Sequence, residues 1–313
     1  MSGTPTPAGA PVLVVVGPTS AGKTELAMRL AEPLGGEIVS ADSRQIYQGL
    51  DVGTGKPSAE QLQRVPHHLV SSEPPGRVMT AALFAEQADA ACREITARGQ
   101  RVLLVGGTGL WIRAFMDGLA PTSPPDPGVR AQLAARMQAE GRDALHAELA
   151  RVDPETAARL HPADWIRVIR ALEIYHTSGR PASAWPKIAG PARPGVWLGV
   201  TRPRAELYAR AEARIDEWLA AGWVQEVETL LAGGLAPETP AMQALGYSHL
   251  VRYVRGEWPL ARAVELIKRD TRRYIKRQLT WFLADSRIRW TDASGGLDAA
   301  LDSLAAASRE AEE

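Results

Sequence analysis

The chain has a single cysteine, Cys92, among its 313 residues. One cysteine excludes a disulfide within the chain and a cysteine-based metal site, and it fits a reducing, cytoplasmic setting. Cys92 lies in the helical pattern of residues 80–100, which favours a buried, apolar thiol over a reactive one.

Long apolar runs are also missing. No stretch of eighteen apolar residues occurs, so we expect no membrane span and no membrane partner. The first residues, MSGTPTPAGAP, lack the basic start and the apolar stretch of a secretory signal. We therefore expect a cytoplasmic protein, and nothing in the sequence implies a protein partner, so a monomer is the default.

The chain has no net charge, which by itself argues against a nucleic-acid partner. The charge is unevenly distributed, however. Residues 252–289 contain eleven basic and four acidic side chains, whereas residues 292–313 contain six acidic side chains and one basic one. An acidic tail thus hides a basic region from the sum over the whole chain.

A phosphate-binding motif stands near the start of the chain. Residues 17–24 read GPTSAGKT, with an apolar strand pattern before them and a helical pattern after them. Gly17 and Gly22 let the backbone turn its N–H groups onto phosphate oxygens, and the helix adds its positive end. Lys23 supplies a charge, and Thr24 can hold Mg²⁺ through its hydroxyl. The predicted phosphate-binding residues are Gly17, Pro18, Thr19, Ser20, Ala21, Gly22, Lys23 and Thr24.

Strand patterns alternate with helical patterns, which predicts an α/β fold with a parallel sheet of doubly wound type. Ligands of such sheets bind at the carboxyl ends of the strands. The loops after the first three predicted strands contain Lys23, Asp42 and Thr108, so we expect these side chains to meet in one crevice.

Two proline-rich stretches, near residues 119–128 and 180–195, enclose a section of helical patterns. The sequence therefore predicts a catalytic α/β core from residues 1–119 and 196–313, with basic helices near its end. Residues 120–195 form an all-helical insertion domain in this prediction. The last residues of the chain are expected to be a frayed helix or disordered.

Asp42 separates this chain from most P-loop enzymes. P-loop NTPases hold Mg²⁺ with an aspartate that ends a later apolar strand, but the strand at 101–105 runs into GGTG. The acidic residue instead follows the second strand, as Asp42. It is either a turn-forming residue or a group that serves a proton or a metal, because a carboxylate beside phosphate is otherwise repelled.

Several collinear motifs together resemble the bacterial tRNA dimethylallyltransferases. They are GPTSAGKT (17–24), SADSRQIYQGLDVGTGKP (40–57), PHHL (66–69), GGTGLW (106–111), HPAD (161–164), RALEIY (170–175), LGY (245–247) and KRQLTWF (276–282). The resemblance covers nearly the whole chain. One departure is Ile166, where the family often has a glutamine that would contact tRNA.

The resemblance implies a fold like that of P-loop kinases and a prenyl transfer. A dimethylallyl group would move from dimethylallyl diphosphate to N6 of the adenosine 3′ of the tRNA anticodon. Lys23 and Mg²⁺ near Thr24 would stabilise the leaving diphosphate. Asp42 would be the general base and Thr108 would position the reacting groups. Arg210 would hold the diphosphate, with Arg214 as its rival.

The resemblance also implies contacts with the anticodon stem-loop of tRNA. The residues that match are Asp42, Ser43, Arg44, Gln45, Arg167, Arg170, Gly246, Tyr247, Arg273, Lys276, Arg277 and Gln278. Tyr247, Trp281 or Phe282 would stack on loop bases, unless they pack in the core instead. His67 and His68 match no metal pattern and are expected to be a hydrogen-bonding pair in a loop.

Two other functions remain open from the residues alone. One is a nucleotide or small-molecule kinase in which the helical insertion is a lid. The other is an RNA-binding module that retains a phosphate loop without turnover. Gly22, Lys23 and Thr24 beside Asp42 argue against the second, and the long motif at 40–57 argues against the first.

Overall fold

The structure, a computed structural model, describes residues 11–186, 192–296, 298 and 301. The contacts divide the chain into two compact units. The first unit comprises residues 1–116 and 193–313, and the second comprises residues 117–192. The sequence expectation for the last residues of the chain falls mostly outside the described part.

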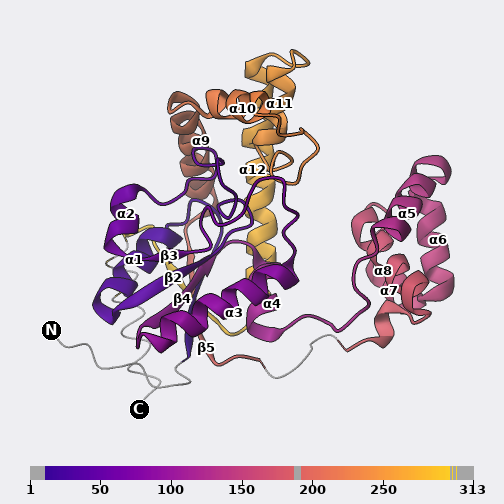
Figure 1. Ribbon diagram of the computed structural model, residues 1–313, viewed down its shortest axis with the longest axis horizontal. Helices are drawn as coiled ribbons and strands as arrows, with labels where there is room; N and C mark the ends of the chain where they lie inside the picture. The colour runs from indigo at the N-terminus through magenta and orange to yellow at the C-terminus, as the bar shows by residue number, and fades with distance from the viewer. Residues whose placement is uncertain (1–10, 187–191, 297, 299–300, 302–313) are drawn as a thin grey trace. The chain divides into compact units, whose positions relative to one another are not determined.

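A six-stranded parallel sheet forms the centre of the first unit (Figure 1). Its strands are β1 (Val12–Val16), β2 (Gly36–Ala41), β3 (His67–His68), β4 (Arg101–Gly106), β5 (Gly195–Thr201) and β6 (Ile288–Asp292). They lie in the order β3-β2-β4-β1-β5-β6, and neighbouring strands are parallel throughout. The predicted α/β fold is confirmed.

Alternate residues of each strand face opposite sides of the sheet, so two cores form. On one side Val14 and Leu104 pack with α3 (Ala81–Ala97) and α4 (Gly109–Asp117). On the other side Val15 and Leu103 pack with α1 (Lys23–Leu34). Cys92 is buried in the first core, and burial raises the pKa of its thiol to about 12, as expected of an inert cysteine.

The remaining helices of this unit are α2 (Ala59–Arg64), α9 (Arg204–Ala220), α10 (Trp223–Ala232), α11 (Tyr247–Val254) and α12 (Leu260–Leu283). Helix α12 packs on α9 and α11, and α11 also packs on α10. Helices α9, α10, α11 and α12 gather beside the sheet in the brown-to-yellow part of Figure 1. Within the described residues, no helix has both the length and the hydropathy needed to cross a bilayer.

The second unit is helical, with α5 (Pro127–Glu140), α6 (Arg142–Val152), α7 (Pro154–Arg159), α8 (Trp165–Ser178) and the 3₁₀ turn η1 (Ala182–Ala184). Gly141, with a φ of 88°, separates α5 from α6, although residues 129–152 have one helical pattern in the sequence. The two helices fold together around Leu133, Leu145 and Leu149, with Leu172 from α8.

Candidate active site

The phosphate-binding loop joins β1 to α1. Gly17 has a φ of 148°, and a Cβ there would lie 2.2 Å from the carbonyl oxygen of Val200, so only glycine fits. Gly22 has a φ of 109° and precedes α1 without a side-chain cap. Gly22 has no side chain that could cap the helix. N–H groups at the start of a helix that lack such a cap suit the binding of an anion.

Lys23 lies inside this loop. Its ammonium donates a 2.8 Å hydrogen bond to the carbonyl oxygen of Pro18. Burial lowers the pKa of Lys23 to about 8; the nearby Asp42 carboxylate opposes that shift, and the Arg214 guanidinium adds to it. A buried ammonium with few partners is a strong binding group for an anion that enters the loop.

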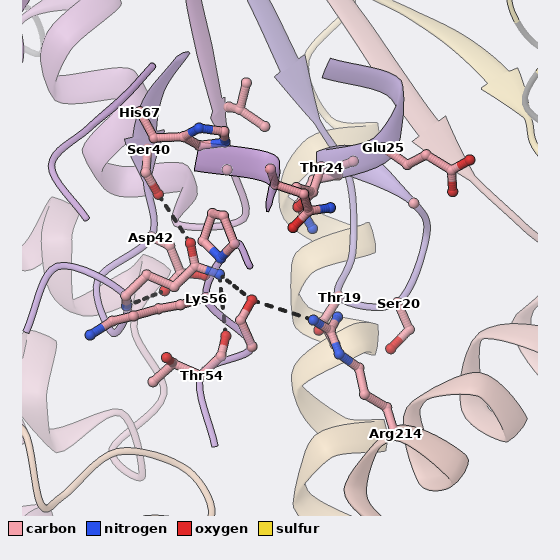
Figure 2. A pocket seen from close by; sticks show the side chains of 18 of the residues that line it. Thr19, Ser20, Thr24, Glu25, Ser40, Asp42, Thr54, Lys56, His67 and Arg214 are labelled. Carbon is pink, nitrogen blue, oxygen red and sulfur yellow. Dashed lines mark hydrogen bonds between the residues drawn. The ribbon is translucent and has the colours of Figure 1, made fainter. Parts of the chain in front are cut away.

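A cavity of about 460 Å³ opens beside the loop (Figure 2). Thr24 and Glu25, at the start of α1, lie on one side of it, and Asp42, Thr54 and Lys56 lie on another. Its lining also includes Ser40, Gln45, His67, Arg210 and Arg214. We call it the donor cavity.

Asp42 follows the last residue of β2, as the sequence predicts. Its Oδ1 accepts hydrogen bonds from the backbone N–H groups of Arg44 (2.8 Å) and Gln45 (3.3 Å), so it is also a turn-forming residue. The two roles predicted for Asp42, turn formation and chemistry in the site, are compatible. Its Oδ1 accepts the hydrogen bonds of the turn, and the side chain also lines the donor cavity.

Thr108 lies beside the Asp42 turn. Its Oγ1 accepts a 3.1 Å hydrogen bond from the N–H of Ser43, and its own N–H donates to the carbonyl oxygen of Ala41. The loops after β2 and β4 are thereby linked at the carboxyl ends of neighbouring strands. Strand β4 itself ends in Gly106, without an acidic residue.

A second cavity, of about 780 Å³, adjoins the donor cavity. We call it the acceptor cavity. Its lining includes Thr108, Arg44, Tyr274, Arg277 and Trp281. Six residues line both cavities: Thr19, Ser20, Asp42, Thr54, Arg214 and Trp218. Asp42 therefore lies where the two cavities adjoin.

Arg210 and Arg214 lie one turn apart on α9. Arg210 donates a 3.1 Å hydrogen bond to the carbonyl oxygen of Ser20 in the phosphate-binding loop. Arg214 donates to the carbonyl oxygen of Gly55 across 3.4 Å and stacks over Trp218. Burial is the largest influence on Arg214 and lowers its pKa. Both arginines line the donor cavity, but only Arg214 also lines the acceptor cavity.

The basic residues of α12 differ in their surroundings. Arg273 and Arg277 line the acceptor cavity, where Arg273 pairs with Asp270 at 3.1 Å and Arg277 lies over the Tyr274 ring. Lys276 is exposed. Arg272 instead pairs with Glu212 on α9.

Two residues expected to contact tRNA are used inside the protein. Tyr247 is fully buried, packs edge-on against Trp223 and donates a 2.5 Å hydrogen bond to Glu226, which agrees with the core-packing alternative. It also belongs to the lining of the acceptor cavity, so base stacking by Tyr247 stays a prediction. Gln278 is 5% exposed and hydrogen-bonds two loops of the core, although it also belongs to the lining of the acceptor cavity, so its contact with RNA stays a prediction.

The aromatic alternatives are divided between the core and the surface. Phe282 is 2% exposed and packs in the core with Tyr247. Trp281 is 40% exposed, lines the acceptor cavity and has Arg113 over its ring. All three line the acceptor cavity, and Trp281 has the most exposed ring of the three to offer to an unstacked base. Gly246 caps α11 with a φ of 91°, which is a structural role.

Arg44 and Gln45 are partly buried and hold backbone. Arg44 donates to the carbonyl oxygen of Pro240, and Gln45 donates to those of Thr54 and Gly55. In the second unit, Arg170 is tied to Glu173 and to the carbonyl oxygen of Ser123, whereas Arg167 is exposed and pairs only loosely with Asp164. Ile166 beside it is 65% exposed.

His67 and His68 form β3 rather than a loop. Nδ1 of His67 donates to the carbonyl oxygen of Val65, and His68 lies 2.6 Å from Glu37, so the expected hydrogen bonding is present. His67 also lines the donor cavity, which the sequence did not indicate.

The segment at 51–57 is the main part of the site that sequence reasoning missed. Glu226 of α10 accepts 2.7 Å hydrogen bonds from the N–H groups of Asp51 and Val52. Lys56 donates to Asp51 and to the carbonyl oxygen of Tyr47. The segment lines both cavities, and its glycine-rich sequence, DVGTGKP, was the available signal.

A divalent cation would find oxygen ligands in the donor cavity. No group of three or more His, Cys, Asp or Glu side chains with metal-site spacing occurs in the described part of the chain. Mg²⁺ does not need such a group, because it keeps several waters and binds one or two protein oxygens together with substrate phosphates. Thr24 lies at the helix start, so its hydroxyl fits this role.

The sequence of the chain is similar to those of transferases that act with isopentenyl or dimethylallyl groups. The IPP transferase family model matches residues 45–285. A tRNA dimethylallyltransferase 2 of Geotalea uraniireducens is 47% identical over 284 residues, which cover 90% of this chain and 92% of that protein.

Solved structures agree with this likeness. A tRNA isopentenylpyrophosphate transferase of Bacillus halodurans is 37% identical, with a TM-score of 0.66, over 90% of this chain and 89% of that one. A tRNA delta(2)-isopentenylpyrophosphate transferase of Staphylococcus epidermidis is 32% identical, with a TM-score of 0.69, over 96% of this chain and 99% of that one.

Proposed function

The chain belongs to the IPP transferase family, and we propose that its two cavities bind the two substrates of one reaction, dimethylallyl transfer to tRNA. The enzyme is a prenyltransferase whose acceptor is tRNA. The observation that carries the finer assignment is the shared lining: Asp42 and Arg214 belong to both cavities.

The donor cavity takes dimethylallyl diphosphate. The loop at residues 17–24, the start of α1 and the Lys23 ammonium bind the diphosphate, and Arg210 and Arg214 add charge from α9. No phosphoryl group moves in this reaction. The diphosphate is the leaving group, and these cations stabilise the charge that develops on it.

We further propose that Mg²⁺ is required. When bound with the diphosphate, it neutralises part of the charge on the leaving group. Thr24 is the residue of this chain that would hold it. Lys23, Arg210 and Arg214 are the protein's own cations beside that site.

The acceptor cavity takes the adenosine 3′ of the anticodon. An adenine must leave its stack to reach an enclosed site, as in other enzymes that modify bases. Arg273 and Arg277 contact phosphates of the anticodon stem-loop at the cavity, and Trp281 offers an exposed ring for stacking. Because the acceptor is tRNA, we also propose a cytoplasmic location.

The chemical step is a displacement at C1 of the dimethylallyl group. The bond from C1 to the diphosphate oxygen breaks, and a bond from C1 to N6 forms. The N6 proton passes to the Asp42 carboxylate, and the diphosphate leaves with the electron pair of the broken bond. Thr108, tied to the Asp42 turn through Ser43, positions the amine.

The kinase alternative lacks support in this site. Phosphoryl transfer needs an acidic residue at a strand end for the metal, and β4 instead ends in Gly106, with Gly107 after it. The carboxylate of Asp42 serves proton transfer better than phosphate binding, because it would repel a γ-phosphate.

The deciding experiment incubates the protein with unmodified tRNA, Mg²⁺ and dimethylallyl diphosphate, without ATP or GTP. The tRNA is then digested and the adenosines are weighed, and released pyrophosphate and phosphate are measured. We expect one dimethylallyl-adenosine per pyrophosphate. A parallel reaction contains ATP in place of dimethylallyl diphosphate. Release of phosphate from ATP that depends on tRNA, with no modified adenosine in the first reaction, would support the kinase instead.

A further inference from the structure

Gln278 connects the last long helix to two loops of the active site. Its Oε1 accepts a 2.9 Å hydrogen bond from the N–H of Thr19, in the phosphate-binding loop. Its Nε2 donates a 3.0 Å hydrogen bond to the carbonyl oxygen of Gly107, next to Thr108. The side chain is 5% exposed, so these two bonds replace its bonds to water.

At neutral pH an amide side chain matches the hydrogen-bonding groups of these two loops. One end of the side chain must accept from an N–H, and the other end must donate to a carbonyl oxygen. A glutamate in its ionised form cannot donate, and an apolar side chain would leave both backbone groups of the loops unpaired. A buried backbone group without a partner is costly, so the loops would move to find one.

Position 107 has no room for a side chain while Gln278 is in place. A Cβ at this position would lie 2.3 Å from Nε2 of Gln278. The next glycine of the turn is equally confined, since a Cβ on Gly109 would lie 2.1 Å from Trp281. Helix α12 is thus seated directly on the turn that carries Thr108.

The same helix faces the acceptor cavity. Arg273, Arg277 and Gln278 itself line that cavity, as does Gly107, whereas Thr19, the other partner of Gln278, lines both cavities. Gln278 is therefore the point at which the helix that we assign to RNA contacts the loop that we assign to the diphosphate.

We propose that Gln278 is a positioning residue, which fixes the phosphate-binding loop and the Thr108 turn for the transfer step and does not contact RNA. The inference rests on the proposed diphosphate site. The Thr19 N–H is already bound to Gln278, so the loop grips the diphosphate with its remaining N–H groups and Lys23. Without Gln278, the Thr19 peptide is free to turn away.

The first test measures binding of inorganic pyrophosphate with Mg²⁺ and, separately, binding of unmodified tRNA. Gln278→Leu should weaken pyrophosphate binding by about 5- to 150-fold, the effect of leaving buried hydrogen-bonding groups unpaired. Affinity for tRNA should remain within about twofold of the parent, because no RNA contact is lost. Gln225→Leu, at an exposed position of α10, is the matched control and should change neither affinity.

A second variant separates positioning from loss of folding. A protonated glutamate has one hydroxyl donor and one carbonyl acceptor, which is the arrangement of the amide, while an ionised one repels the Gly107 carbonyl. Burial raises a glutamate pKa. Gln278→Glu should therefore bind pyrophosphate poorly at about pH 8 and recover toward the parent affinity at about pH 5.5, relative to the parent at each pH. Gln278→Leu should not recover.

A double-mutant cycle tests the close approach. Gly107→Ala should weaken pyrophosphate binding in the parent protein but much less in Gln278→Ala, because the atom that the new methyl group meets is gone. Unchanged pyrophosphate affinity in Gln278→Leu, or a loss of tRNA affinity alone, would overturn the inference. A parent protein that binds no pyrophosphate would overturn the proposed function itself.

Discussion

The Lys23 ammonium is 2.8 Å from the carbonyl oxygen of Pro18, so in the free protein the loop holds the cation that we assign to the diphosphate. Burial lowers the pKa of this ammonium to about 8. Below that pH the group is charged and binds an anion, and above it the free protein must first take up a proton.

Pyrophosphate affinity should therefore decrease as pH rises above 8, by up to about tenfold per pH unit. Calorimetry in buffers of different ionisation enthalpy would show proton uptake on binding in this range. Lys23→Arg keeps its charge and is the control for the titration of pyrophosphate itself. If the affinity of the parent protein for pyrophosphate changed with pH in the same way as that of Lys23→Arg, protonation of Lys23 would not control binding.

Asp42→Asn removes the proposed proton acceptor and keeps the shape of the side chain. We expect kcat to fall by about 10²–10⁴-fold, the usual effect of losing a general base. Binding of tRNA should change little. Single-turnover transfer is the measurement, and a near-parental rate would leave Asp42 only its turn-forming hydrogen bonds to Arg44 and Gln45.

The fold and the centre of the site follow from local sequence patterns. Residues 12–34 contain a strand, a glycine loop and a helix with Gly35 in a left-handed conformation at its end, each with its own signal. Asp42 and Thr108 meet because parallel strands β2 and β4 end at the same edge of the sheet. The order of strands and loops in the sequence is enough to predict that Asp42 and Thr108 lie close together.

The rest depends on contacts between distant segments. Gln278 has the sequence context of an RNA-binding helix, and only the packing of α12 on residues 106–109 turns it inward. Tyr247 likewise points into the core because Glu226, 21 residues before it, offers a carboxylate. Strand β3 has two residues and takes its conformation from its neighbour β2, so no local pattern predicts it.

The basic side chains of α12 should differ in their contribution to tRNA binding. Removing one phosphate contact lowers the slope of log affinity against log salt by about 0.7–1. We expect this change for Arg273→Ala and Arg277→Ala, which line the acceptor cavity. Arg272→Ala is the matched control, because Arg272 pairs with Glu212. Parental slopes for all three variants, and for Lys276→Ala, would exclude this helix as the RNA-binding face.

Tyr247→Phe should affect stability rather than RNA binding. The hydroxyl donates to the Glu226 carboxylate, and hydrogen bonds to charged groups contribute about 1.5–3 kcal/mol. Urea unfolding should show a loss of this size. The ring remains buried against Trp223, so tRNA affinity should stay near the parent value. A selective loss of tRNA affinity without a change in unfolding would restore the contact with RNA.

Arg210 and Arg214 offer a matched pair for locating the charge that acts on the leaving group. Arg210 contacts the loop from an exposed position, while Arg214 is half-buried and lines both cavities. Burial lowers the pKa of Arg214, but the ordinary pKa of an arginine is so high that the group stays charged at neutral pH. Its charge acts through a lower dielectric, so it should stabilise the developing diphosphate charge more strongly. We expect Arg214→Gln to lower the single-turnover rate by about 10²–10³-fold, as for other preorganised donors, and Arg210→Gln to lower it by less than about tenfold. A larger loss of rate in Arg210→Gln than in Arg214→Gln would place the diphosphate near Arg210 and Ser20 and would exclude a role of Arg214 in the transfer step.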